Sequence, residues 1–300
     1  MEGRVVKLQE IEKLLEADVV KDGQFGTLGL LTHESTDMLV YLCSDGYISE
    51  LKENDHISCV MTNEKLSGAI PKEKGVIVCS NPTKSFYQLH NYLTECTSFY
   101  GKDFDSVIGD GAYIHHAAQV ASKNVRIGKN VRIESGAIVQ ENSIIEDDVV
   151  LRVGCVIGTS GFDFKRIGKE IVSVRHAGGV LLHRGVEVQS FSNIDCAVFG
   201  GFTEVGEDTK IDKHVHIAHH SIIGKRCLIA AHALVAGSSK VGDDVWMGPG
   251  AIISSNILIG DRAKINIGSI VTKDIKPEQT VSGNFAIDHN RFISFIKSIG

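Results

Sequence analysis

Four histidines stand close together in the segment IDKHVHIAHHSIIG: His214, His216, His219 and His220. Imidazole is the usual general base near neutral pH and also the commonest metal ligand, so such a cluster favours proton transfer or zinc binding. Three of these side chains, those of His214, His216 and His220, are interpreted as surface residues on turns. His219 differs because of the residue that the surrounding repeat places beside it.

An aliphatic residue returns at every sixth position from Val205 to Val271. A six-residue period fits neither an amphipathic helix nor a lone strand, but it suits a short strand plus a turn with one inward aliphatic side chain. Three such hexads make a triangular coil of about 18 residues, and coils stack at the ~4.8 Å spacing of paired strands. The repeat therefore predicts a mainly β fold, a parallel β-helix filled by a ladder of Ile and Val. Its aliphatic positions are Val205, Ile211, Ile217, Ile223, Ile229, Val235, Val241, Met247, Ile253, Ile259, Ile265 and Val271.

One coil of about 18 residues forward from His219 stands Gly237, in the segment VAGSS. Stacked coils would bring the imidazole beside a bare backbone, where a substrate can approach the main-chain N–H. A base next to one oxyanion donor is what acyl transfer to an amine needs, because the nitrogen loses a proton as it attacks a thioester carbonyl. The spacing thus favours an acyl-transfer site at His219 and Gly237.

The chain divides into three predicted parts. Residues 1–104 show helical spacing and short apolar runs, which predict a small α/β domain. Hexads predict the β-helix over residues 105–285, broken by an excursion at 159–181 where the frame is lost. An excursion from such a helix usually projects from one face and often carries function. Residues 286–300 predict a short C-terminal helix whose apolar stripe packs.

Composition limits the possible partners and the compartment. A net charge of −6 with scattered basic residues argues against a nucleic-acid binder. The seven cysteines show no CxxC spacing, so they are interpreted as reduced thiols rather than a zinc ribbon or a disulfide framework. No stretch approaches the ~18 apolar residues of a membrane span, and the N-terminus lacks a signal-peptide pattern. We therefore expect a cytoplasmic protein without a membrane span.

These segments give the whole chain a resemblance to the UDP-3-O-acylglucosamine N-acyltransferases of lipid A synthesis, which are left-handed β-helix trimers. IAHHSIIG is similar to the catalytic segment of that family and places its base on His219, and VAGSSKVG places its oxyanion glycine on Gly237. Asp212 stands where the family has an aspartate that could orient the imidazole. VIGTSGFDF resembles the loop that opens the family's excursion, and SGNFAIDHNRF resembles its closing segment. The resemblance implies a left-handed helix, a homotrimer and sites between subunits.

The resemblance also implies a uracil-binding site in the N-terminal domain, formed by Tyr41, Ser44 and Tyr47, where aromatic faces can stack on a pyrimidine. Ser44 replaces an asparagine of the family. Asn256 similarly replaces a second histidine and Lys273 replaces a late arginine, and both are carried over as substrate-binding positions. The helical C-terminal extension of the family, implicated in contacting acyl carrier protein, is much shorter in this chain.

The resemblance predicts an N-acyltransferase that moves an acyl group from acyl-CoA or acyl carrier protein to the amine of a nucleotide-activated amino sugar. The pathway would be lipid A or surface polysaccharide synthesis, and the departures lean toward surface polysaccharides and short acyl groups from coenzyme A. No cofactor is expected beyond the acyl-CoA or acyl carrier protein co-substrate, and no metal. The amino sugar, the nucleotide, the acyl chain length and the acyl carrier stay open.

Two other functions remain alternatives. A γ-type carbonic anhydrase shares the hexapeptide helix and holds zinc between histidines at a trimer interface, but it would leave the N-terminal domain without a use. A non-catalytic β-helix scaffold would make His219 and Gly237 incidental. A zinc assay separates the first alternative, and a turnover test separates the second.

Overall fold

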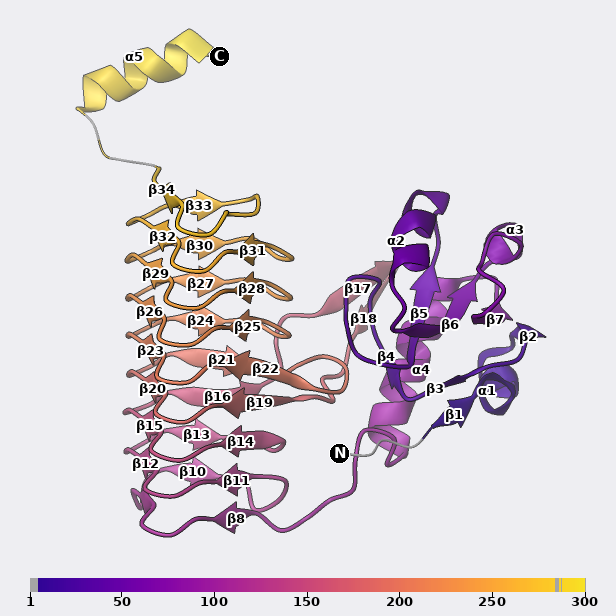
Figure 1. Ribbon diagram of the computed structural model, residues 1–300, viewed down its shortest axis with the longest axis horizontal. Coiled ribbons are helices and arrows are strands. Elements are labelled where there is room, and N and C mark those ends of the chain that lie inside the picture. Colours follow the sequence, from indigo (N-terminus) through magenta and orange to yellow (C-terminus); the bar gives the residue numbers. More distant parts are fainter. Residues whose placement is uncertain (1–4, 284–285, 287, 300) are drawn as a thin grey trace.

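The largest part of the computed structural model, which describes residues 5–283, 286 and 288–299, is a parallel β-helix (Figure 1). Short strands stack in three parallel sheets that form the faces of a triangular column. Neighbouring coils pair in register, as Ile217 does with Val235. The column is left-handed, so the predicted fold class is confirmed.

Each face of the column is one sheet, whose strands follow one another from the first coil to the last. One sheet contains β8 (Val107–Ile108), β11 (Arg126–Ile127), β14 (Ser143–Ile145), β19 (Gly179–Leu182), β22 (Phe202–Val205), β25 (Ile222–Ile223), β28 (Lys240–Val241) and β31 (Leu258–Ile259). The second contains β9 (Tyr113–Ile114), β12 (Arg132–Ile133), β15 (Val150–Leu151), β20 (Glu187–Val188), β23 (Lys210–Ile211), β26 (Leu228–Ile229), β29 (Trp246–Met247), β32 (Lys264–Ile265) and β34 (Thr280–Val281). The third contains β10 (Gln119–Val120), β13 (Ile138–Val139), β16 (Val156–Thr159), β21 (Asn193–Asp195), β24 (His216–Ile217), β27 (Leu234–Val235), β30 (Ile252–Ile253) and β33 (Ile270–Val271).

The aliphatic residue of each hexad points into the column. From Val205 to Val271 these side chains are all buried, with Ile229 only 1% exposed. Removing such a side chain from water stabilises the fold by about 1.5–3 kcal/mol, so the ladder holds the coils together. The predicted core is confirmed.

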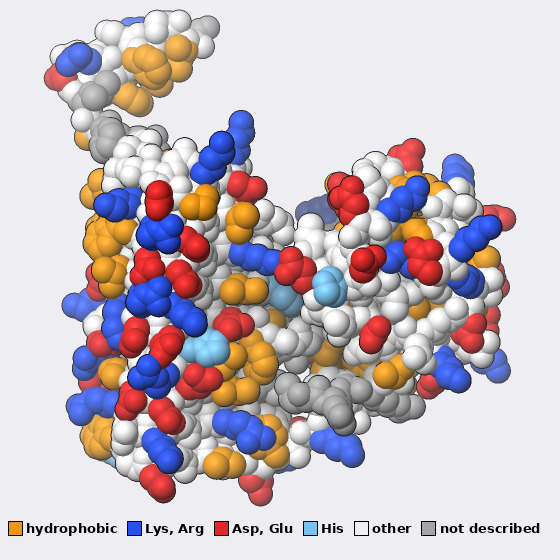
Figure 2. Space-filling model, in the orientation of Figure 1, with side chains coloured by type: hydrophobic (Ala, Val, Ile, Leu, Met, Phe, Trp, Pro, Cys, Tyr) orange, Lys and Arg blue, Asp and Glu red, His pale blue; other side chains and the backbone are white. Residues whose placement is uncertain are grey.

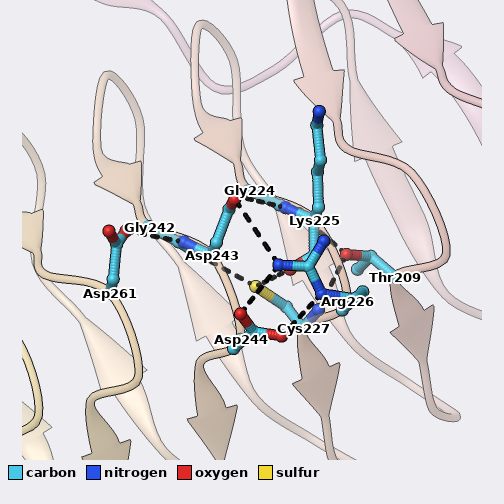
Figure 3. Close-up of polar contacts among 9 residues, drawn as sticks. All are labelled: Thr209, Gly224, Lys225, Arg226, Cys227, Gly242, Asp243, Asp244 and Asp261. Atoms are coloured by element: carbon cyan, nitrogen blue, oxygen red, sulfur yellow. Dashed lines mark hydrogen bonds and ion pairs between the residues drawn. The ribbon is translucent and has the colours of Figure 1, made fainter.

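Small polar side chains join the coils at the corners (Figure 3). Thr209 is fully buried, donates its hydroxyl to the Gly224 carbonyl (2.8 Å) and accepts the Cys227 N–H (3.0 Å). Outside the same corner, Asp243 Oδ1 accepts the Lys225 N–H (2.8 Å). These bonds satisfy turn groups that the short strands leave unpaired. They fix the corners, and therefore the positions of the turn side chains.

The N-terminal part contains a five-stranded sheet in the order β2-β7-β6-β5-β4, in which only β2 is antiparallel to its neighbour. Helix α4 packs against β5 and β6 and begins at Pro82, and the Asn81 side chain accepts the Lys84 N–H (3.0 Å). The elements are β1 (Val6–Lys7), α1 (Leu8–Leu15), β2 (Asp18–Lys21), β3 (Gln24–Phe25), β4 (Thr27–Leu28), β5 (Met38–Leu42), the 3-10 helix η1 (Asp45–Tyr47), α2 (Ile48–Glu53), β6 (Ile57–Thr62), α3 (Glu64–Ser67), β7 (Gly75–Val78) and α4 (Pro82–Cys96).

The excursion from the column contains an antiparallel hairpin, β17 (Phe164–Ile167) and β18 (Glu170–Ser173), which lies toward the N-terminal part (Figure 1). Helix α4 binds the chain just after the hairpin. Asn91 Nδ2 donates to the Ser173 carbonyl (2.8 Å), and Asn91 Oδ1 accepts the Arg175 N–H (2.9 Å). The two strands of the hairpin pair with each other, and α4 forms hydrogen bonds to the chain that follows them. The excursion is therefore an ordered element that connects the column to the N-terminal part.

Helix α5 (His289–Ile299) stands away from the column (Figure 1). We expected its apolar stripe to pack, but Phe292, Phe295, Ile296 and Ile299 are 43–66% exposed within the single chain. That expectation is therefore wrong for one chain alone. Residues 284, 285, 287 and 300, which flank the predicted helix boundaries, lie outside the described residues. None of the described helices is both long and apolar enough to cross a bilayer.

Candidate active site

His219 and Gly237 lie one above the other on adjacent turns of the column. A Cβ on Gly237 would come within 2.6 Å of His219 Cε1 and 2.8 Å of His219 Nε2, so only glycine fits there without a shift. The Ser238 N–H donates to the His219 carbonyl (2.9 Å), and the Asn256 N–H donates to the Gly237 carbonyl (3.1 Å). Among the residues described, none accepts a hydrogen bond from the Gly237 N–H. The predicted juxtaposition of an imidazole and a bare backbone is present.

The excursion brings a second histidine to this place. The Gly161 N–H donates to His176 Nε2 (3.1 Å), and the His176 and His219 rings meet edge to face at 5.8 Å between centroids. Because Nε2 accepts a bond, the proton of neutral His176 is on Nδ1. A Cβ on Gly161 would lie 3.2 Å from His219 Cδ2 and 2.8 Å from Asp195 Oδ2. Two glycine backbones therefore enclose the His219 ring.

Two carboxylates stand beside these histidines. Asp195 is 3% exposed and accepts bonds from Asn193 Nδ2 (2.5 Å) and Thr159 Oγ1 (3.2 Å). Its Oδ2 lies 3.3 Å from His216 Nε2. Asp163 is 9% exposed and pairs with Lys165 Nζ at 2.7 Å. The site thus holds two buried negative charges, each with its own partners.

Burial sets the protonation of the central histidine. It lowers the pKa of His219, and the charges of Asp163 and Asp195 oppose this only in part. Burial also lowers the pKa of His176, and the charge of His219 acts in the same direction. The hydrogen bond to Asp195 raises the pKa of His216 instead. His219 is therefore neutral at pH 7, the state in which an imidazole can accept a proton.

Asp212 is not beside His219 in the chain. It follows β23, whereas His219 follows β24, so the two residues occupy different corners of the coil. Its Oδ1 accepts the Lys213 N–H (2.8 Å), and it lines a shallow hollow with Leu228 and Trp246. The carboxylates whose charges reach His219 within one chain are Asp163 and Asp195 instead. The assignment of Asp212 as an orienting partner is therefore corrected for contacts inside one chain.

Two of the three histidines interpreted as surface residues have structural partners. His216 binds Asp195, and His220 Nδ1 accepts the Val198 N–H (3.0 Å) while its ring stacks on His33. His214 is exposed, as expected, and stacks on His232 at 5.0 Å. These partners come from the preceding coil, Asp195 and Val198, and from the N-terminal part, His33, and the aliphatic repeat by itself indicates neither source.

The three predicted uracil-binding residues lie at the carboxyl end of β5 and just beyond it. Tyr41 is half-buried, and its ring contacts Phe86 (4.9 Å) and Tyr87 (5.8 Å). Ser44 caps η1, its hydroxyl accepting the Gly46 N–H (3.3 Å), and Tyr47 is 55% exposed. Ligands commonly bind outside the carboxyl ends of parallel strands, so the position suits a ligand, although Tyr41 is partly occupied by core packing.

Asn256 and Lys273 fall in different places. Asn256 is exposed and lines a groove of about 380 Å³ between the loop 32–35 and the column, where Lys240 pairs with Glu34 at 2.8 Å. Figure 2 shows this hollow between the two parts, with acidic and basic side chains intermixed over the visible face of the column. Lys273 is exposed at the last coil, in a separate hollow with Ile275 and Val281. Only Asn256 is near the turn that carries Gly237.

Sequence reasoning missed Asp163, Lys165 and Asp195. Asp163 and Lys165 lie inside the segment GFDFK of the excursion, where the hexad frame gives no guide to position. Asp195 stands one residue after the aliphatic Ile194, the place in the repeat that is usually small or polar. A carboxylate there was the signal that could have identified it. Among the described residues, no three His, Cys, Asp or Glu side chains converge as metal ligands would.

Comparison with known proteins identifies the repeat. The family model described as "Bacterial transferase hexapeptide (six repeats)" matches residues 202–237. A protein of Gloeobacter violaceus named UDP-3-O-acylglucosamine N-acyltransferase 1 is 50% identical over 141 residues, 47% of this chain and 40% of that protein. A UDP-3-O-acylglucosamine N-acyltransferase of Chromohalobacter salexigens is 41% identical over 81 residues, 27% of this chain and 23% of that protein. The matches span less than half the length of these relatives.

Solved structures agree on the fold. The UDP-N-acetylglucosamine acyltransferase from Campylobacter jejuni aligns with a TM-score of 0.53 and 23% identity, covering 65% of this chain and 79% of that one. The Arabidopsis UDP-N-acetylglucosamine acyltransferase aligns with a TM-score of 0.53 and 22% identity, covering 60% and 62%. At these identities the likeness concerns the fold alone. The relatives by sequence confirm the predicted resemblance, and each of the two is named an N-acyltransferase.

Proposed function

We propose that this chain, a hexapeptide-repeat protein related to the UDP-3-O-acylglucosamine N-acyltransferases, transfers an acyl group from a thioester to the amine of a nucleotide-linked amino sugar. The observation that carries the proposal is the His219 imidazole lying on the bare backbone of Gly237, beside a main-chain N–H that donates to none of the described residues. A base and an oxyanion donor in contact are the minimum that aminolysis of a thioester requires.

In the proposed reaction the amine nitrogen attacks the thioester carbonyl while His219 Nε2 removes its proton. The Gly237 N–H donates to the oxygen as it becomes negative. The tetrahedral adduct then expels the sulfur, the imidazolium returns its proton to the thiolate, and the products are an amide and a free thiol. The lowered pKa of His219 keeps the imidazole unprotonated, and therefore able to accept a proton, at neutral pH.

The acceptor is proposed to be UDP-linked. The relatives by sequence are named for UDP-3-O-acylglucosamine. In this chain, Tyr47 is exposed beside the carboxyl end of β5, and the ring of Tyr41 contacts the ring of Tyr87. Asn256 and Lys273 remain proposed substrate contacts, with Asn256 the nearer to Gly237. The pathway is proposed to be lipid A or surface polysaccharide synthesis.

The working form is proposed to be a homotrimer in the cytoplasm that needs only acyl-CoA or acyl carrier protein as co-substrate. Leu228 (47% exposed) and Trp246 (41% exposed) pair on one face beside Asp212, an apolar surface that a second copy would cover. In such an assembly, Asp212 of a neighbouring copy is the proposed partner of His219. All seven cysteines are free thiols, in keeping with a reducing compartment.

The direct test is a matrix of UDP-linked amino sugars against acyl-CoA and acyl carrier protein donors, read by mass spectrometry for the amide product and by release of free thiol. We expect one acceptor and donor pair to give both products in equal amounts. His219→Ala is the matched blank for hydrolysis and spontaneous transfer. Amide formed equally by this variant, or none formed from any pair, would contradict the proposal.

A further inference from the structure

Lys165 is a cationic side chain of the excursion that faces the N-terminal part. It lies on β17, where Lys165 and Ile167 are half-buried and Phe164 and Arg166 are exposed, so Lys165 faces inward. Its Nζ lies 5.2 Å from the centroid of the Tyr87 ring and 2.7 Å from Asp163 Oδ1. The ammonium group is thus held between an aromatic face and a carboxylate.

These contacts place Lys165 between the two halves of the proposed substrate site. On one side, Tyr87 contacts Tyr41, the inner residue of the proposed base-binding end. On the other side, Asp163 lies close enough for its charge to act on His219, as does the charge of Lys165 itself. A continuous series of neighbours therefore runs from Tyr41 through Tyr87, Lys165 and Asp163 to the catalytic imidazole.

A nucleotide-linked sugar has its base at one end, the sugar at the other and a diphosphate between them. If the base lies by Tyr41 and the amine by His219, the diphosphate must pass the intervening position. Two other cations join α4 to the excursion, but the side chains of both partners in each pair are exposed, Lys84 with Glu170 (3.3 Å) and Arg175 with Glu95. Lys165 instead lies between Tyr87 and the buried Asp163. Resting on the proposed function, we propose that Lys165 binds the diphosphate of the acceptor and fixes the distance between base and amine.

Asp163 pairs with Lys165 when no substrate is bound. Without substrate, the ammonium group neutralises a carboxylate that is 9% exposed and would otherwise be costly to bury. A lysine side chain is a mobile point charge with three donors, so Lys165 can hold Asp163 and a phosphate oxygen together. The pair therefore supplies a preformed cation without leaving a buried charge unpaired.

The test compares UDP with uridine by calorimetry, because the two ligands differ only in the diphosphate. We expect wild-type protein to bind UDP at least ~10-fold more tightly than uridine, and Lys165→Met to lose ~10-fold or more in UDP affinity with uridine unchanged. Arg166→Met, on the exposed face of the same strand, should bind both ligands as wild type does. The double variant Asp163→Asn with Lys165→Met leaves no unpaired carboxylate and should reproduce the loss if the single variant unfolds.

Each outcome separates this inference from the proposed reaction. If Lys165→Met keeps the preference for UDP while wild type acylates a UDP-linked amine, the inference is wrong and the reaction stands. If the preference is lost in the variant but no acceptor is ever acylated, Lys165 is a diphosphate ligand and the proposed reaction is wrong. An equal loss for UDP and uridine would make Lys165 a structural residue and overturn the inference, and a wild type that binds neither ligand overturns both.

Discussion

His33 of the N-terminal part stacks on His220 of the column, with 4.6 Å between ring centroids and 22° between planes. Phe199 contacts both rings at 5.9 Å and also contacts His90 of α4 at 4.9 Å. Three histidines from three segments therefore surround one phenylalanine where the two parts of the chain meet. His220, which adjoins the proposed base, contributes to this junction.

His220→Ala should weaken the fold more than the chemistry. The change leaves the buried Val198 N–H without its acceptor and removes the stack on His33, which should cost about 1–3 kcal/mol of unfolding free energy. Turnover per folded molecule should stay near that of wild type. Thermal unfolding and turnover measured on one preparation test both statements, with exposed His214→Ala as the control. A large fall in turnover at unchanged stability would give His220 a catalytic role.

Acid should destabilise the junction through the same histidines. Burial lowers the pKa of His33 and of His90 to about 4, and lowers that of His220 well below its usual value. Below about pH 6.5 these histidines bind protons in the unfolded chain but not in the folded chain. Their contribution to the free energy of unfolding is therefore fully present above that pH and is lost as pH falls toward 4. For His33 alone the loss at pH 4 is about 3 kcal/mol.

Urea unfolding at pH 7.5 and pH 5 measures this loss. His33→Gln removes one of the titrating groups, so the variant should lose less stability than wild type between the two pH values. A variant that lost as much as wild type would show that His33 is not buried in the neutral form.

Trp246→Asp tests the proposed trimer. Trp246 and Leu228 form the paired apolar contact on one face, and a carboxylate there could be buried against a second copy only at a cost of several kcal/mol. We expect light scattering to return a trimer for wild type and a monomer for Trp246→Asp. Lys169→Asp, on the turn of the hairpin, should remain trimeric. A wild-type monomer at working concentration would contradict the assembly.

The period of the sequence was enough to predict the column because one aliphatic side chain per hexad must face the interior. The same count placed His219 over Gly237, since position in a stacked coil follows directly from position in the chain. Off the repeat this reasoning fails. The hairpin β17–β18 follows no hexad frame, so the pairing of Asp163 with Lys165 and the meeting of His176 with His219 depend on contacts with α4 and distant coils.

The same limit explains Asp212. Resemblance transferred a residue that the family has near its base, but seven positions along a triangular coil lead to a different corner. Asp195, one residue after an aliphatic ladder position, was beyond the reach of the 18-residue count, because the coil that joins Ile194 to Ile217 is longer and 18 residues counted backward from His219 lead to Gly201.

Gly237→Ala should lower turnover without unfolding the protein. Its methyl group would lie within 2.6 Å of the His219 ring, so the ring or the turn must shift and the N–H leaves its place beside the base. Loss of one oxyanion donor typically costs ~10²–10³-fold in turnover. Gly68→Ala, at a glycine with open space around it, is the control for the substitution itself. Near-normal turnover in Gly237→Ala would place the oxyanion elsewhere.

His219→Ala should lower turnover by about 10²–10⁴-fold, the usual contribution of a positioned base, while the thermal midpoint stays close to that of wild type. The fold should tolerate the change because the aliphatic ladder, and not this side chain, fills the column. The Nδ1 atom of His219 is buried and has no hydrogen-bond partner among the described residues, so removing the ring breaks no such bond.

The pH dependence gives a second, independent test of the base. A protonated imidazole cannot accept the proton of the amine, so activity should rise with pH through the ionisation of His219. Because burial lowers the pKa of His219, the midpoint of that rise should lie below the usual pKa of a histidine. By neutral pH, ionisation of His219 should no longer change the activity. His176→Gln keeps an acceptor for the Gly161 N–H and removes the other buried imidazole, so it should retain the rise. If the rise persisted in His219→Ala and vanished in His176→Gln, His176 would be the base and His219 its neighbour.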